Sequence, residues 1–316
     1  DKAVFQGQIL AFARDMPRDG HLLVLTGPAI TNERFTPGRS FPQSFRAAKV
    51  LSASACAGET ESLTFVLYAF GPVQDIRVEA SDLTGEKAVV PSRSVDLRVV
   101  KYWYQAGREL SRHMEKPTGP LLVPELLLKD DSLIVVDREA KRNFMRTPQG
   151  LVDISDPKAD LSGLAPRDSK ELQPFDLQAG ELKQIWVNIK VPAGTAAGSY
   201  RGSITVKPPN APQIHLPLTL EVYPFTLLPP VIEYSIFYRG VLSRDGLPHI
   251  STRKVQQLSE EQYLAQMKNL LDHGVVSATS YQSRAPLFRR EMELRARAGL
   301  PKGSIYTYNP ATNREQ

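Results

Sequence analysis

Two runs of alternating apolar and polar residues flank the segment VPAGTAAGSYRGSITV, which spans residues 191–206. Every second residue from 185 to 191 is Ile or Val, and every second residue from 200 to 206 is Tyr, Gly, Ile or Val. A period of two is typical of half-buried antiparallel strands. The pattern restricts this part of the chain to β structure and predicts a hairpin over residues 182–206.

The three glycines of this segment, Gly194, Gly198 and Gly202, follow one another at intervals of four residues. A phosphate-binding loop would need a Lys-Ser/Thr pair or a helix directly after the last glycine, and a strand follows instead. A helix-pairing motif would need about 20 apolar residues around it, which Pro192 and Arg201 exclude. We therefore expect the first glycine to shape a turn and Gly198 to begin the returning strand.

The segments before the predicted hairpin also have the character of strands separated by turns. Many short strands with Gly and Pro between them favour a β-sandwich, which we expect over residues 1–228. SLTFVLYAF at 62–70 is apolar on both faces and predicts a central strand, whereas Pro217 predicts an edge strand at 214–223. Residues 155–170 lack periodicity and predict a surface loop. The other predicted strands cover residues 22–25, 75–80, 95–104 and 132–137.

The pattern changes after the predicted linker YPFTLLPP at residues 223–230. A strand at 232–240, a helix at 259–274 with a capping box from Ser259 to Gln262, and a strand at 275–281 follow. A second helix, with Pro286 in its first turn and Gly299 at its end, precedes a strand at 304–308. This order is typical of an α/β fold with parallel strands. Since a complete (β/α)₈ barrel needs about 250 residues, the sequence predicts an incomplete (β/α) barrel segment at 229–316. The fold class is thus multi-domain, β plus α/β.

Composition and charge exclude several classes of protein. The net charge of +5 is spread along the chain without a basic cluster, so we expect no nucleic-acid partner. A single cysteine, Cys56, between two alanines predicts a buried structural thiol, and with five scattered histidines we expect no metal site and no cofactor. No stretch is long and apolar enough for a membrane span. The start at Asp1 without Met fits a mature secreted or periplasmic protein after removal of a signal peptide, or a chain that was trimmed.

Several of these segments together resemble a known family. In order along the chain they are AGETESLTFVLYA, IRVEASDL, VDLRVVKYWY, LVPELLLKDD, FDLQAGELKQIWVNIKVPAGTAAGSYRGSITV and LPLTLEVYPFTLLPP. They are similar to the N-terminal β-sandwich module of glycoside hydrolase family 123 and of related uncharacterised bacterial barrel proteins. The resemblance covers residues 45–230 well and the barrel opening more loosely. It implies that a catalytic (β/α)₈ barrel follows the sandwich.

The resemblance also implies a substrate-assisted mechanism, in which adjacent Asp and Glu residues on a barrel strand serve as the orienting group and the acid/base. No Asp-Glu dipeptide occurs in this sequence. The nearest pairs are Asp130-Asp131, in a predicted sandwich loop, and Glu260-Glu261, in the first turn of a helix, where acidic residues favour the macrodipole. We therefore expect no catalytic residue in this chain, and no glycoside hydrolysis by it alone.

Ligand contacts are expected where barrel strands end, because such folds keep their sites there. Aromatic rings can stack on sugars, and Arg or Asn can bind hydroxyl groups. The alternative is that these residues only form the rim of an unfinished barrel. Trp103, Tyr104 and Trp186 could form a sugar platform on the sandwich, but a buried or interface position is favoured. The predicted substrate-binding residues are Tyr238, Arg239, Tyr281, Arg284, Tyr308 and Asn309.

The sequence thus predicts part of a bacterial glycan-processing glycoside hydrolase. Its expected partners are a carbohydrate ligand and either the rest of the barrel or another subunit over the open sheet edge. Two alternatives stay open: a non-catalytic carbohydrate-binding or adhesion module, and a purely structural β-sandwich.

Overall fold

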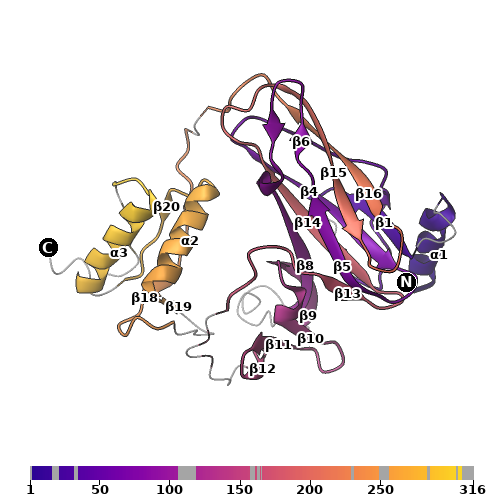
Figure 1. Cartoon of the computed structure of the whole chain (residues 1–316). Helices are drawn as coiled ribbons and strands as arrows, with labels where there is room; N and C mark the ends of the chain where they lie inside the picture. Colours follow the sequence, from indigo (N-terminus) through magenta and orange to yellow (C-terminus); the bar gives the residue numbers. More distant parts are fainter. Residues whose placement is uncertain are drawn as a thin grey trace. The chain divides into compact units, whose positions relative to one another are not determined.

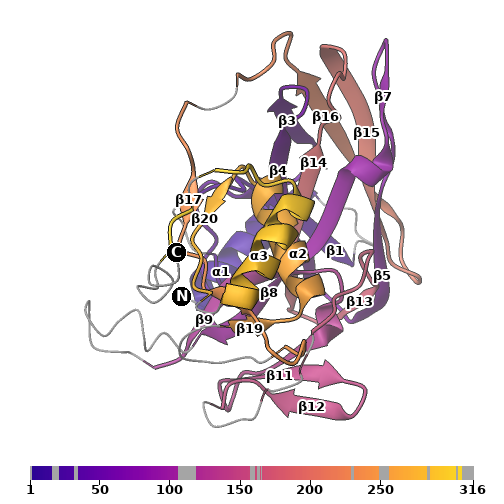
Figure 2. The same cartoon turned by 90° about the vertical axis from the view of Figure 1, so that its left-hand side faces the viewer.

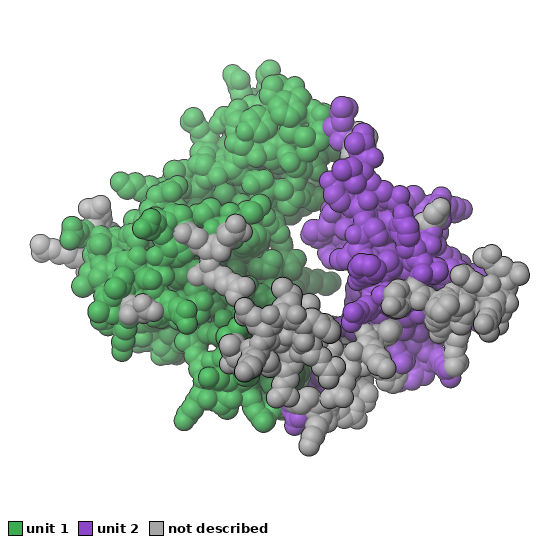
Figure 3. Space-filling model, turned by 180° about the vertical axis from the view of Figure 1, so that it is seen from behind, with its two compact units in different colours: residues 1–155, 168–227 green, residues 156–167, 228–316 purple. Residues whose placement is uncertain are grey.

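The computed structural model describes residues 2–15, 21–31, 35–105, 119–156, 161, 164, 166–228, 231–248, 256–282, 285–303 and 305–307. The chain divides into two compact units (Figure 3). Unit 1 comprises residues 1–155 and 168–227, and unit 2 comprises residues 156–167 and 228–316.

The first sheet of unit 1 is antiparallel, with β4 in its interior between β1 and β14 (Figure 1). Phe65 and Leu67 of β4 contribute to one apolar cluster, and Val66 and Tyr68 contribute to another on the opposite face. The prediction of a central strand covered on both faces is therefore confirmed. In spatial order the strands are β2 (Arg46–Ala47), β1 (Leu22–Gly27), β4 (Thr60–Ala69), β14 (Leu182–Lys190), β8 (Val95–Gln105) and β9 (Leu121–Leu128).

The second sheet of unit 1 shares the larger apolar cluster with the first. Fully buried side chains from both sheets meet there, among them Phe65 and Ile185 from one sheet and Ile204 and Leu218 from the other. The prediction of a β-rich protein is confirmed. In spatial order the strands are β13 (Phe175–Leu177), β5 (Val73–Ala80), β15 (Gly198–Lys207), β16 (Ile214–Val222) and β3 (Leu51–Ala55). In addition, β6 (Leu83–Thr84) pairs with β15, and β7 (Val89–Val90) pairs with β6.

The predicted hairpin over 182–206 is wrong, although both of its strands exist. β14 pairs with β4 and β8 in the first sheet, whereas β15 pairs with β16 and β5 in the second. Residues 191–197 therefore connect the two sheets. Gly194 and Gly198, at φ +80° and +142°, supply the backbone conformations of this connection. The alternation could not show this, because strands that face one core from opposite sides have the same pattern as strands that pair.

The third glycine of the segment serves a close approach of two chains. A Cβ atom on Gly202 would lie 2.5 Å from the carbonyl oxygen of Asp82 and 2.6 Å from a methyl group of Leu83. Gly202 therefore lets the start of β6 pack directly on β15.

Replacing Gly202 with alanine should destabilise unit 1 by about 2 kcal/mol, because overpacking against a backbone oxygen forces the chains apart. The decrease should be measured by urea denaturation followed by tryptophan fluorescence. Gly71→Ala is the matched control, since the nearest atom to its new Cβ would be 4.0 Å away. Equal effects of both substitutions would contradict the close-approach role.

The edge-strand prediction for Pro217 needs a correction. β16 pairs with β15 along its whole length and, from Leu218 to Val222, also pairs in parallel with β3. Pro217 lies directly before this parallel pairing. β16 therefore has neighbouring strands on both sides from Leu218 onward. Up to Pro217 it has a neighbour on one side only, and there a residue without an N–H is tolerated.

An N-terminal helix that the sequence analysis did not predict packs on the outer face of the first sheet. α1 (Lys2–Phe12) buries Phe5 and Ile9, which are one helical turn apart, in the second apolar cluster with Val66 and Tyr102. The side chain of Gln8 ties the helix to the backbone of Phe41, with an N–H···O distance of 2.7 Å. The helix is followed by a 3₁₀ turn, η1 (Ala13–Asp15).

A small antiparallel sheet completes the regular structure described for unit 1. It contains β10 (Ile134–Asp137), β11 (Arg142–Thr147) and β12 (Gly150–Asp153), and short 3₁₀ turns lie at η2 (Ser92–Ser94) and η4 (Asp131–Leu133). The described residues of the predicted loop at 155–170 lie outside helices and strands.

Unit 2 combines two helices with short parallel strand pairs. β17 (Ser235–Ile236) pairs with β20 (Ser277–Ala278), and β18 (Gly240–Leu242) pairs with β19 (Gln256–Leu258). A parallel bridge also joins Ser280 to Thr307. β17 and β20 are shorter than the strands predicted at 232–240 and 275–281, and the sequence analysis did not predict the pair of β18 and β19.

The two helices of unit 2, α2 (Glu260–Asp272) and α3 (Ala285–Ala298), lie side by side (Figure 2). The predicted capping box is confirmed: Ser259 accepts the N–H of Gln262, and the Gln262 side chain accepts the N–H of Ser259. Tyr263, Met267 and Leu294 are buried between the helices and the strands. This core fixes the side chains described next.

Candidate functional site

The structure describes three of the six predicted ligand-contacting residues. Tyr238 lies between β17 and β18 and is half-buried, and the neighbouring Arg239 is exposed. Tyr281 follows β20 and is half-buried. Sugar contact by these residues stays a prediction. Arg284, Tyr308 and Asn309 lie outside the described residues.

Tyr238 also packs into the core of unit 2. Its hydroxyl donates to Oε1 of Gln266 on α2 at 2.6 Å, and its ring meets the ring of Tyr263 edge-on at 5.8 Å between centroids. Burial raises the pKa of Tyr238, and the charge of Glu291 adds to this increase. The hydroxyl and one side of the Tyr238 ring therefore make contacts within the unit.

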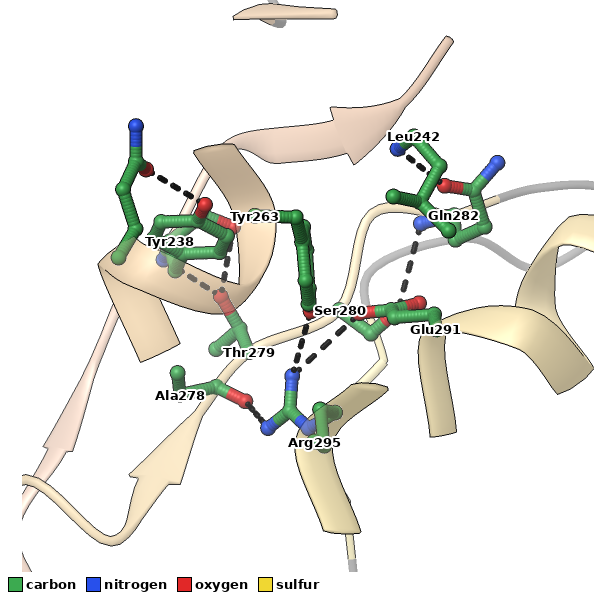
Figure 4. Close-up of polar contacts among 10 residues, drawn as sticks. Tyr238, Leu242, Tyr263, Ala278, Thr279, Ser280, Gln282, Glu291 and Arg295 are labelled. Carbon is green, nitrogen blue, oxygen red and sulfur yellow. Dashed lines mark hydrogen bonds and ion pairs between the residues drawn. The ribbon is translucent and has the colours of Figure 1, made fainter. Parts of the chain in front are cut away.

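A buried carboxylate, which the sequence analysis missed, organises the polar interior of unit 2 (Figure 4). Glu291 of α3 is fully buried; it accepts the hydroxyl of Tyr263 at 2.6 Å and that of Ser280 at 2.7 Å. Arg295, one turn further along α3, lies 3.4 Å from the same carboxylate and donates to the carbonyl of Ala278. The network thus joins both helices to the end of β20.

The electrostatics of this network reflect its burial. Burial raises the pKa of Glu291, and the hydrogen bonds from Tyr263 and Ser280 and the charge of Arg295 only partly oppose the increase. Burial also raises the pKa of Tyr263, as does the neighbouring carboxylate. The phenol therefore remains protonated and keeps its role as donor.

Side-chain hydrogen bonds also hold the strand ends of unit 2 in register. Thr279 accepts the N–H of Tyr238 at 2.8 Å, and Gln282 accepts the N–H of Leu242 at 2.8 Å. The sequence signal was the run of hydroxyl residues in VVSATSY, which is unusual for a strand that is buried. These bonds position the segment that carries Tyr281.

The chemistry open to this network is limited. Both oxygens of Glu291 accept hydrogen bonds, and the side chain has no exposed surface. A general acid or base must come within hydrogen-bond reach of the substrate. Glu291 therefore holds the elements together and supplies no accessible proton carrier.

Asp131, one of the discounted acidic residues, is bound by two lysines from the first sheet. Its carboxylate lies 3.1 Å from Nζ of Lys101 on β8 and 2.6 Å from Nζ of Lys183 on β14. Burial acts to raise the pKa of Asp131, but the two ammonium groups outweigh it and the pKa lies below its ordinary value. Asp130 accepts the N–H of Ser132 and caps the 3₁₀ turn η4. Both residues thus have structural contacts.

Glu260, of the other acidic pair, also has a structural contact. Arg290 of α3 approaches its two carboxylate oxygens at 2.7 and 2.6 Å. These hydrogen bonds are the main cause that lowers the pKa of Glu260. The pair joins the exposed sides of the two helices.

The three aromatic residues on unit 1 do not form one platform. Trp103 and Tyr104 are neighbours on β8, and successive residues of a strand point to opposite faces. The indole N–H of Trp103 donates to Glu125 at 2.6 Å, and that of Trp186 donates to Asn188 at 2.8 Å. All three rings are half-buried, and the favoured buried or interface position stays a prediction.

Cys56 is buried, and burial, followed by the charge of Glu59, raises the pKa of its thiol. A thiol of this kind is a poor nucleophile. Over the ranges that the structure describes, no group of three or more His, Cys, Asp or Glu side chains could hold a metal ion. None of the described helices has both the length and the apolar character that crossing a membrane requires.

Unit 1 contains a surface cavity of about 370 Å³ that the sequence analysis did not predict. The end of β6 and the turn that follows it, residues 84–87, form one side, and Ala197 with the first residues of β15, 198–201, forms the other. The cavity therefore lies beside the connection between the two sheets.

Comparison with known proteins places the fold. The model of the glycoside hydrolase 123 N-terminal domain matches residues 29–208. A solved family 123 glycoside hydrolase from Clostridium perfringens, described in terms of glycolipid glycan hydrolysis, is similar at 14% identity with a TM-score of 0.52. The alignment covers 83% of this chain and 44% of that one, so the chain spans less than half of that hydrolase. At this identity the likeness shows the fold alone.

Two other solved structures are much less similar. AvmM, which catalyses macrocyclization in alchivemycin A biosynthesis, has 11% identity and a TM-score of 0.25 over 56% of this chain and 87% of its own. Murine CRIg has 9% identity and a TM-score of 0.18 over 54% and 92%. Neither score supports an argument, and no curated protein matches the sequence.

The family assignment rests on the domain match, which spans more than half of the chain and includes β4, β8, β14 and β15. The chain belongs to the family of proteins that carry the glycoside hydrolase 123 N-terminal domain.

Proposed function

We propose that this chain is the N-terminal part of a bacterial, secreted or periplasmic glycoside hydrolase that processes glycans. Residues 1–228 would form the β-sandwich module, and residues 229–316 would open the (β/α) catalytic barrel. The observation that carries the proposal is the family 123 N-terminal domain match over residues 29–208, followed by a unit whose described strand pairs are all parallel.

The exposed apolar residues of unit 2 support the barrel part of the proposal. Parallel sheets are normally covered on both faces. Around β17, however, Val231 is fully exposed, and Phe237 is 76% exposed. Further βα units of the same hydrolase, or another subunit, would cover this surface. The other exposed apolar side chains of this region are Ile232, Tyr234, Ile236 and Tyr306.

The catalytic carboxylates would lie in the part of the hydrolase that this sequence does not contain. The sequence has no adjacent Asp-Glu pair, and the acidic candidates Asp131, Glu260 and Glu291 are engaged in ion pairs or hydrogen bonds. Tyr238, Arg239 and Tyr281 would contribute to the rim of the substrate site, together with Arg284, Tyr308 and Asn309.

The chain of residues 1–316 should therefore not hydrolyse aryl N-acetylhexosaminides, whereas a longer reading frame that completes the barrel should. One positioned acid or base contributes about 10²–10⁴-fold to the rate, so loss of the pair should abolish measurable turnover. Release of the aryl group, measured for both proteins at equal concentration, checks this prediction.

Comparable turnover by the short chain would contradict the proposal. Sugar binding without turnover by either protein would favour a non-catalytic carbohydrate-binding module. If neither protein binds sugars or hydrolyses them, the remaining interpretation is a purely structural β-sandwich.

A further inference from the structure

The cavity in unit 1 has walls that the fold holds in place. The ring of Tyr200 lies directly under Gly85, where a Cβ atom would come within 2.7 Å of it. The buried ring is fixed by its hydroxyl, which donates to the carbonyl of Ala196 at 2.7 Å. On the other side, the N–H of Gly85 donates to the carbonyl of Ala88 at 2.9 Å and closes the turn.

The chain leading into β6 is also bound to β15. The N–H of Ser81 donates to the carbonyl of Ser203 at 2.9 Å, and the N–H of Ser203 donates to the hydroxyl of Ser81 at 2.9 Å. Together with the close approach at Gly202, these bonds fix the two walls relative to each other. The cavity is therefore formed before any ligand arrives.

The charged side chains at this cavity do not form ion pairs with one another. Glu86, Lys87 and Arg201 are exposed, and none of their side chains forms a hydrogen bond or ion pair with a residue that the structure describes. Elsewhere on the same sheet exposed charges do pair, as Lys207 does with Glu79 at 2.6 Å. The residues that line the cavity thus include two cationic residues, one carboxylate and the two hydroxyl residues Thr84 and Ser199.

We infer that this cavity binds a single sugar residue that carries one negative charge. The three charges sum to +1, which complements a monoanion, and Arg can bind a carboxylate or sulfate through two parallel hydrogen bonds. Glu86 and the two hydroxyls suit the hydroxyl groups of a sugar ring. A volume of about 370 Å³ lies near the lower end of the roughly 300–1,000 Å³ typical of ligand pockets, which favours a monosaccharide unit.

Recognition here would depend on charge and hydrogen bonds. The aromatic ring at the cavity, Tyr200, is 2% exposed and offers no free face for stacking. The site lies in unit 1 and does not depend on a completed barrel. It would let the module hold an acidic glycan independently of hydrolysis.

Amide NMR titration of residues 1–316 tests the inference. At constant ionic strength, sodium glucuronate and glucose 6-sulfate should shift the amide signals of Gly85, Gly198 and Ser199. Glucose should bind at least tenfold more weakly. Arg201→Ala should raise the Kd for glucuronate at least tenfold, and Lys87→Ala should raise it several-fold. Lys207→Ala, on the same sheet, removes an equal charge and should leave the Kd unchanged.

Each other outcome overturns a defined part of the inference. If glucose binds as tightly as glucuronate, the claim that the ligand is anionic is overturned. If inorganic sulfate binds as tightly as glucuronate, the claim that the ligand is a sugar is overturned. If Lys207→Ala and Arg201→Ala raise the Kd for glucuronate equally, binding depends only on the overall charge of the protein. No shift at these three amides with either acidic sugar would overturn the site. Hydrolase assays of the longer protein are independent of all these results.

Discussion

Replacing Asp131 with asparagine should lower the free energy of unfolding of unit 1 by about 3 kcal/mol. The substitution leaves Lys101 and Lys183 facing each other without the carboxylate that lies between them, at 3.1 and 2.6 Å. Removing one partner of a buried ion pair costs about 3–5 kcal/mol, and the 19% exposure of the Asp131 side chain favours the lower end. Urea denaturation followed by fluorescence reports on this unit, because both tryptophans, Trp103 and Trp186, lie in it.

Asp130→Asn provides the matched control. Asp130 caps the 3₁₀ turn η4, and asparagine caps about as well as aspartate, so the change should stay below about 0.5 kcal/mol. Equal destabilisation by the two substitutions would show that Asp131 contributes no more than its neighbour.

The effect of Asp131→Asn should also depend on pH. The folded-state pKa of Asp131 lies below its unfolded value of about 3.9. Its contribution to stability is therefore present above about pH 4 and is lost as the pH falls through the folded-state pKa. The difference between the native protein and the variant should shrink in that range, and a difference that grew with acid would contradict the ion pair.

Replacing Glu291 with alanine should destabilise unit 2 by about 4 kcal/mol. It leaves the buried Arg295 without its counter-ion and the hydroxyls of Tyr263 and Ser280 without their acceptor. Because both tryptophans lie in unit 1, hydrogen exchange of α2 and α3, measured by mass spectrometry, is the suitable measurement. Both helices should exchange much faster in the variant.

Two further variants serve as controls for Glu291→Ala. Glu291→Gln keeps the size and an acceptor oxygen and should cost less than the alanine variant. Glu293→Gln removes an exposed carboxylate that pairs with Arg290 and should cost less than about 1 kcal/mol. Unchanged exchange in Glu291→Ala would show that the network does not stabilise the helices.

The pH dependence of this site has the opposite sign. The folded-state pKa of Glu291 is raised, so its contribution to stability is fully present below the unfolded pKa and is lost as the pH rises through the folded-state pKa. After correction for intrinsic exchange rates, protection of α2 and α3 should fall with rising pH more in the native protein than in Glu291→Gln.

Local pattern predicted which segments form strands but not which strands pair. The alternation on both sides of residues 191–197 gave the buried side chains correctly, because burial depends only on the face of the strand. Pairing depends on distant segments: β14 binds β4, and the contact between Ser62 and Asn188 spans 126 residues. The helix α1 was missed although Phe5 and Ile9 have helical spacing, since the outer sheet face that they cover was not yet known.

The candidate sites were predictable to a similar extent. The order of elements placed Tyr238 and Tyr281 near strand ends, and the Ser259 capping box followed from its four residues. The partners of Asp131 come from strands 30 and 52 residues away, and those of Glu291 come from two other elements. Such contacts leave no periodic signal in the sequence. The cavity beside Tyr200 was equally hidden, because a turn and a strand start from different parts of unit 1 form it.

The parallel pairing of β3 with β16 has a consequence for synthesis on the ribosome. β3 emerges early, but its partner follows much later, since the hydroxyl of Thr219 and the carbonyl of Leu51 that meet there are 168 residues apart. Pairings this distant in sequence are slow to form, and an incomplete sheet exposes an unpaired strand edge. Unit 1 cannot complete its second sheet until β16 has left the exit tunnel, which happens after the whole of the matched domain, residues 29–208, has been translated. Nascent chains from which β15 has left the tunnel and β16 has not would therefore present the β3 edge and the open side of β15 to chaperones and to one another.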